Sequence, residues 1–74
     1  MRATANKKVR DEPERTTTLA TEALVVFEGL LGEDHPQVAA TLAHLAAASL
    51  RTGRPQDARL QFERAAKIQR DAYG

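Results

Sequence analysis

Apolar residues recur at spacings of three and four in three stretches of this chain, the period of one face of an α-helix. The first stretch runs from about Glu14 to Leu31, the second runs to about Thr52, and the third covers about Pro55 to Tyr73. No stretch shows the alternation of apolar and polar residues that is expected of a strand. The pattern therefore predicts three helices and an all-α fold.

The same spacings assign an inward face to each predicted helix. The first helix is expected to bury Leu19, Ala23, Val26, Phe27, Leu30 and Leu31. The heavier inward residues of the second helix are Leu42, Leu45, Ala46, Ser49 and Leu50, and those of the third helix are Ala58, Phe62, Ala65, Ala66, Ile68 and Ala72. All three aromatic residues of the chain, Phe27, Phe62 and Tyr73, are placed as core residues would be.

Glycine and proline mark the boundaries between these helices. Gly32 can adopt the left-handed conformation that ends a helix, and Asp34 is a good N-cap with Gln37 three residues later as its capping-box partner. Pro36 falls in the first turn of the second helix, where a missing N–H does no harm. Gly53 then ends the second helix and Pro55 opens the third, so these two helices should form an antiparallel hairpin.

Charge is distributed unevenly, although the net charge is only +1. Residues 1–15 carry five basic and three acidic groups, residues 16–52 carry one and four, and residues 53–74 carry five and three. We expect residues 1–15 to form a disordered or partly helical basic tail and residues 16–74 to form the helical segment. The acid-free first ten residues also resemble a transit peptide, but a solvated tail is the favoured interpretation. A nucleic-acid binder would show a larger, one-sided excess of basic residues, so nucleic acid is not expected as a partner.

Composition narrows the class of protein further. The chain has no cysteine, which excludes a disulfide framework and a thiolate metal site. Its longest apolar run is Ala23 to Phe27, far shorter than a membrane span, and Met1–Arg15 contains no apolar stretch typical of a secretory signal. We therefore expect a cytoplasmic protein that has no membrane partner.

The segment Leu31–Pro36 reads L-G-E-D-H-P, and 42 residues after Gly32 the chain ends on Tyr73–Gly74, as if the motif began again. A period in this range indicates a helical repeat. Together with ten residues that follow it, the motif resembles a tetratricopeptide repeat of the 42-residue kinesin-light-chain-like type. These residues are Val38, Ala39, Leu42, Leu45, Ala46, Gly53, Ala58, Phe62, Ala65 and Ile68. The first helix resembles the second helix of a preceding repeat, so the resemblance implies about one and a half repeats of antiparallel helical hairpins.

The resemblance also implies a binding groove, with three departures from the family pattern. Ser49 and Pro55 stand where the family commonly has Tyr, and His44 stands where family members have an Asn that helps bind peptide backbones. Because serine is smaller than tyrosine, Ser49 should leave part of the hairpin core unfilled. Arg51 is the residue that could bind an acidic ligand. The residues expected to face the groove, and hence a protein or peptide partner, are Ala40, Ala43, His44, Ala47, Leu50 and Arg51.

Candidate chemistry is sparse. His35 and His44 lie nine residues apart without carboxylates at ligand spacing, and Glu33 and Asp34 are explained as helix-start residues. Ser49 lies in the middle of the second helix, and no potential general base stands at a sequence spacing that would place it beside the hydroxyl. We therefore expect no catalytic, metal or cofactor-binding residues, and no enzyme activity. The basic face of the third helix (Arg59, Arg64, Lys67 and Arg70) is expected to be solvated rather than a docking patch.

These observations predict a protein–protein interaction module that binds a partner protein, or itself, through exposed helix faces. A single hairpin cannot bury its apolar face alone, and about three repeats are normally needed. Two alternatives stay open. The chain could be a fragment of a larger multidomain regulator, or a small regulatory subunit that acts on an enzyme through the groove around His44 and Arg51.

Overall fold

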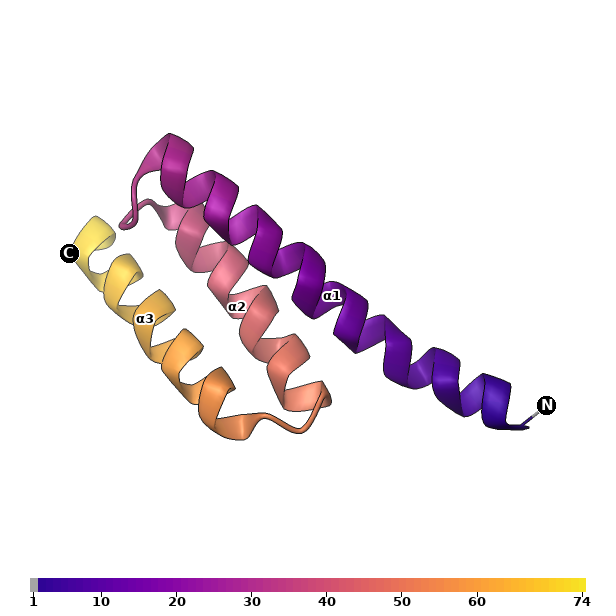
Figure 1. Cartoon of the computed structure of the whole chain (residues 1–74). Coiled ribbons are helices and arrows are strands. Elements are labelled where there is room, and N and C mark those ends of the chain that lie inside the picture. Colours follow the sequence, from indigo (N-terminus) through magenta and orange to yellow (C-terminus); the bar gives the residue numbers. More distant parts are fainter. Residues whose placement is uncertain (1) are drawn as a thin grey trace.

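The fold consists of three α-helices joined by short turns, as a computed structural model shows (Figure 1). The structure describes the backbone of residues 2–74 and the side chains of Glu12 and of residues 14–74. The helices are α1 (Arg2–Leu31), α2 (Pro36–Arg51) and α3 (Pro55–Tyr73), and the described residues contain no strand. The predicted all-α class and the three-helix count are confirmed.

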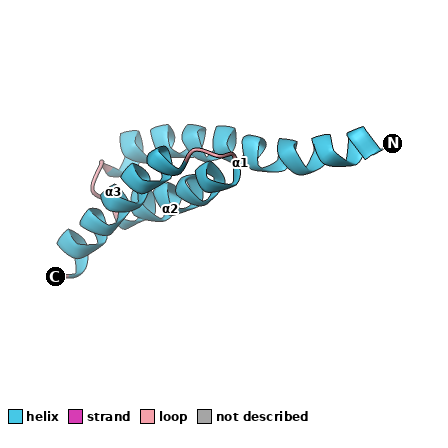
Figure 2. Ribbon diagram, turned by 90° about the horizontal axis from the view of Figure 1, so that it is seen from below, coloured by secondary structure: helices cyan, strands magenta, loops and turns pink. Residues whose placement is uncertain are grey.

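Helix α2 lies between α1 and α3 and runs antiparallel to both (Figure 1). Helix α1 starts well before the expected position near Glu14, and its N-terminal part projects beyond the other two helices (Figures 1 and 2). The boundary that the sequence placed between residues 15 and 16 falls inside α1. Met1 and the side chains of residues 2–11 and 13 lie outside the described part of the chain.

The turn between α1 and α2 corrects one prediction about helix capping. The N-cap of α2 is His35, not Asp34: its backbone is extended, and its ring Nδ1 accepts a hydrogen bond of 3.0 Å from the Gln37 N–H. Gly32 has a φ of +92°, as expected of a residue that ends a helix, and Pro36 occupies the first turn of α2. The cap therefore sits one residue later than the capping-box pattern indicated.

We expect replacement of His35 by alanine to lower the free energy of unfolding by about 1 kcal/mol, because it removes the acceptor for one N–H at the start of α2. In a domain of this size, that loss corresponds to a drop in Tm of about 4–8 °C. Thermal unfolding followed by circular dichroism measures it. Asp34→Ala is the matched control and should change Tm little; a larger loss for Asp34→Ala would contradict the assignment of the cap.

The turn between α2 and α3 forms as predicted. Gly53 adopts a φ of +78°, and Pro55 is the first residue of α3. The Arg54 N–H donates to the Ser49 carbonyl at 2.8 Å, and the Thr52 hydroxyl donates to carbonyl oxygens near the end of α2. These bonds satisfy backbone groups that the end of a helix would otherwise leave unpaired.

The core lies where the three helices meet. Its most buried members come from α2 and α3, and Leu24 and Phe27 of α1 pack against them. The cluster combines two alanines with three aliphatic side chains, and α2 buries two further alanines, Ala46 and Ala48. The buried cluster consists of Val38, Ala39, Leu42, Ala65 and Ile68.

Two polar contacts tie the helices together beside this core. The Ser49 hydroxyl donates to Gln61 Oε1 of α3 at 2.9 Å, so the buried Ser49 has a hydrogen-bond partner on the neighbouring helix. Arg64 Nη2 of α3 donates to Glu28 Oε2 of α1 at 2.5 Å, and both side chains are partly buried. This ion pair links the two outer helices directly.

Candidate protein-binding surfaces

The outward face of α2 carries the six residues that the resemblance assigned to a groove. Five of them are exposed and Ala43 is half-buried, while the opposite side of the helix faces α1 and α3. Leu50, which the sequence also placed in the core, is 53% exposed and belongs to this outward face alone. His44 and Arg51 are the polar members of this outward face, and its other residues are apolar (Ala40, Ala43, Ala47 and Leu50).

Helix α1 presents a second surface, which we call the open face of α1 and define by Leu19, Ala23, Val26 and Leu30. The sequence predicted that these residues point inward. That prediction is wrong for the larger ones, because Leu19 is 65% exposed, Leu30 is 76% exposed and Val26 is also exposed. The residues that face the core lie about a quarter of a turn away. They are Ala20, Leu24 and Phe27.

The 42-residue period explains why this face is apolar. Each residue of the open face has a counterpart on α3 that is found by adding 42 to its number. On α3, Ala65 and Ile68 are buried, and Gln61 is bonded to Ser49 of α2. For Leu19, Ala23 and Val26, the face that is open on α1 is therefore equivalent to the face that α2 covers on α3, whereas the counterpart of Leu30 is exposed. The counterparts, in order, are Gln61, Ala65, Ile68 and Ala72.

Helix α3 exposes several apolar residues that were expected in the core. Phe62 is 42% exposed, and Tyr73, Ala66 and Ala72 are also exposed, so the aromatic residues of α3 do not form a closed core. Phe27 on α1 is half-buried. The expected outward residues are exposed apart from Arg64, which is half-buried against Glu28.

Two surface ion pairs lie along α3. Glu63 pairs with Arg59 at 3.6 Å, and Lys67 pairs with Asp71 at 3.5 Å. All four side chains are largely exposed, and such pairs contribute little to stability. On this exposed face of α3, Arg59 and Lys67 each have an acidic partner one turn away on the same helix.

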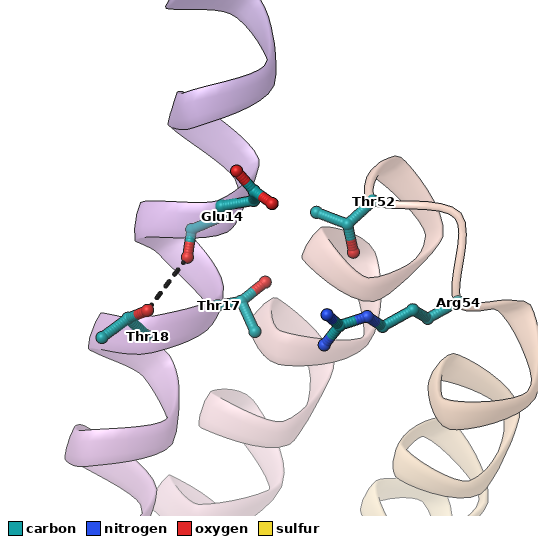
Figure 3. Close-up of a pocket in the computed structure, with 5 residues that line it drawn as sticks. All are labelled: Glu14, Thr17, Thr18, Thr52 and Arg54. Carbon is teal, nitrogen blue, oxygen red and sulfur yellow. Dashed lines mark hydrogen bonds between the residues drawn. The ribbon is translucent and has the colours of Figure 1, made fainter.

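A small polar pocket of about 200 Å³ opens between α1 and the turn that follows α2 (Figure 3). Glu14 and Thr52 approach one another across it, and the Arg54 side chain extends toward Thr17. The Thr18 hydroxyl donates to the Glu14 carbonyl and the Thr52 hydroxyl donates to the end of α2, so both hydroxyls already have acceptors within the chain. The pocket is thus lined by the Arg54 guanidinium, the Glu14 carboxylate and threonine side chains, and the hydroxyls of Thr18 and Thr52 donate to backbone carbonyls.

The described residues contain neither a cluster of metal-ligand side chains nor a membrane-spanning helix. Among the side chains that the structure describes, no group of three or more His, Cys, Asp or Glu residues lies close enough together to hold a metal ion. None of the helices, over the same residues, has the length and apolar character needed to cross a membrane.

Comparison with known proteins gives one match. No curated protein and no solved structure matches the chain. A family model described as tetratricopeptide repeat matches residues 11–71, a range that includes most of α1, all of α2 and nearly all of α3. The match supports the family as a whole, and the kinesin-light-chain-like subtype stays a prediction. The three helices, the Gly–Pro boundaries and this match together establish that the chain belongs to the tetratricopeptide repeat family.

Proposed function

We propose that this chain is a protein–protein interaction module that binds a partner protein, or a second copy of itself, through exposed helix faces. Tetratricopeptide repeats generally mediate interactions between proteins, and they typically serve as scaffolds without catalytic activity. The proposal includes a non-enzymatic role, a cytoplasmic location, and no nucleic-acid or membrane partner. The observation that carries it is the open face of α1, where Leu19, Val26 and Leu30 are exposed.

The open face of α1 exposes a continuous row of apolar side chains to water. Contiguous exposed apolar side chains on a small domain are typical of an interaction site, whereas isolated ones need no explanation. On the open face, Leu19, Ala23, Val26 and Leu30 succeed one another at spacings of four, three and four along one side of the helix. Removing such a row from water is favourable at about 25 cal/mol per Å² of apolar area. A partner helix with an apolar row of its own would fit it.

The outward face of α2 supports the alternative of a regulatory subunit that acts through its groove. His44 and Arg51 lie there beside Ala47 and Leu50, all of them exposed. Such a surface suits a peptide or loop that offers an apolar side chain and a carboxylate. The other alternative, a fragment of a larger regulator, would have further repeats covering the open face.

Paired substitutions separate the two surfaces. A tagged chain is used to purify bound proteins from a lysate of the source organism, and these are identified by mass spectrometry. We expect Leu19→Glu to abolish capture, because it places a charge within the apolar row, and the double variant His44→Ala with Arg51→Ala to retain it. Leu60→Glu is the matched control, since Leu60 on α3 has the same exposed fraction of 65% as Leu19.

Each outcome decides between the proposals. Loss of capture only in the double variant would favour the groove around His44 and Arg51 over the open face. Retention of the same proteins by all the variants, or no capture combined with a strictly monomeric chain, would contradict binding through either helix face. Circular dichroism of each variant checks that the helices are intact.

A further inference from the structure

We propose that a second copy of this chain covers the open face of α1, so that two α1 helices pack antiparallel around a two-fold axis. The inference rests on the proposed function and names the occupant of its principal surface. Three features of the chain support the pairing: the spacing of the apolar row, the charges at its two ends, and the position of α2.

The spacing of the row suits the seam of a helix pair. Leu19, Ala23, Val26 and Leu30 follow the 4–3–4 pattern of alternating seam positions in paired helices. In an antiparallel pair with Leu19 opposite the second copy's Leu30, Ala23 falls opposite Val26, and the same contacts repeat in reverse order. The row then makes leucine layers at both ends and smaller layers at the centre, where Ala23 lets the helix axes approach closely.

The same register brings opposite charges together. Arg15 lies one turn before Leu19 on the same side of α1, and Glu33 and Asp34 follow the end of the helix. With Leu19 opposite Leu30 of the second copy, Arg15 lies beside Glu33 and Asp34 of that copy, and the two-fold axis repeats the contact. All three residues are exposed in the isolated chain. A parallel pair would instead place Arg15 beside Arg15, which is repulsive.

The position of α2 leaves room for this pairing. Helix α2 contacts α1 along the side of Ala20, Leu24 and Phe27, about a quarter of a turn from the open face. The two-fold axis of an antiparallel pair is perpendicular to both helices, so the two α2 helices lie on the same side of the α1 pair, each beside its own α1 and outside the apolar row. A pairing of the open face with Phe62 and Tyr73 of α3 would instead be head-to-tail, and it would continue into open chains rather than closing as a dimer.

Sedimentation analysis across a range of protein concentrations tests the pairing. We expect a monomer–dimer equilibrium, with Leu19→Glu raising the dimer Kd about 30-fold or more because it places a charge in both leucine layers of the pair. Leu60→Glu should leave the Kd unchanged. Arg15→Glu should weaken the dimer, and adding Glu33→Arg should restore it. A monomer at the highest attainable concentration, or species that grow beyond a dimer, would overturn the proposal.

Cysteine crosslinking tests the register independently, because the native chain has no cysteine. In the antiparallel pair, position 19 faces position 30 of the second copy, whereas the two copies of position 19 lie about 16 Å apart along the axis. A disulfide needs a Cα separation below about 7 Å. Oxidation should therefore link the double variant Leu19→Cys/Leu30→Cys into a covalent dimer and neither single variant. A dimer from a single variant would overturn the antiparallel register.

The failure of this inference is distinguishable from the failure of the proposed function. A monomeric chain that still captures a protein in a Leu19-dependent manner contradicts the self-pairing but leaves the interaction module standing. A monomeric chain that captures nothing contradicts both.

Discussion

Replacement of Leu42 by alanine should leave most of the chain unfolded at 25 °C. Leu42 is 2% exposed and belongs to the cluster in which all three helices meet. Removing its buried methyl and methylene groups costs about 2–5 kcal/mol, because the surrounding side chains close only part of the cavity. A core of this size supplies only about 3–5 kcal/mol in total, so the loss is comparable to the whole stability of the domain.

Urea titration followed by circular dichroism measures this effect, and Leu50→Ala is the control. Leu50 lies on the same helix but is 53% exposed, so its truncation should change the free energy of unfolding by about 0.5 kcal/mol or less. The wild-type curve, measured at the same protein concentration, provides the reference. Equal losses for the two variants would show that the buried side of α2 has been wrongly assigned.

Replacement of Ala46 by leucine should destabilise the fold by about 1–3 kcal/mol or more, although leucine is larger, more apolar and a good helix former. Ala46 has no exposed surface and lies on α2, which is enclosed by α1 on one side and α3 on the other. Its neighbours cannot move apart without opening the small core. The added methylene and methyl groups therefore force the helices away from their close approach.

The adjacent residue gives a stringent control. Ala47 is exposed on the outward face of α2, so Ala47→Leu makes the same chemical change in the same helix without overpacking. Thermal unfolding should show a marked drop in Tm for Ala46→Leu and a change of at most a few degrees for Ala47→Leu. Stabilisation by Ala46→Leu would mean that the α2 interfaces contain unfilled space.

Most of the fold could be predicted because glycine and proline act locally. Gly53 and Pro55 fixed the second turn, since one supplies the left-handed backbone and the other tolerates only the first turn of a helix. At the first turn, Asp34 and His35 are adjacent residues that can both accept a bond from a free N–H. Which of the two does so depends on the path of the turn, and a sequence pattern cannot resolve a difference of one residue.

The candidate surfaces were harder to predict because α1 has two apolar sides. Ala20, Leu24 and Phe27 face the core, whereas Leu19 and Leu30 lie on the open face. Helical spacing identifies both sides as apolar but does not say which of them is covered within the chain. The inward set predicted from the sequence therefore mixed the two sides, since it joined Phe27 of the core side to the four residues of the open face. The outward side of α2 was assigned from the family resemblance, and five of its six residues are exposed.

The placement of α2 between its two neighbours in the chain also bears on folding kinetics. Each helix packs mainly against the next one along the sequence, across turns of only a few residues. Closing such short segments costs little chain entropy, and domains dominated by local contacts fold in about microseconds to milliseconds. Either hairpin, α1 with α2 or α2 with α3, can form first. The Glu28–Arg64 pair, which joins residues 36 positions apart, can form only after both hairpins are in place.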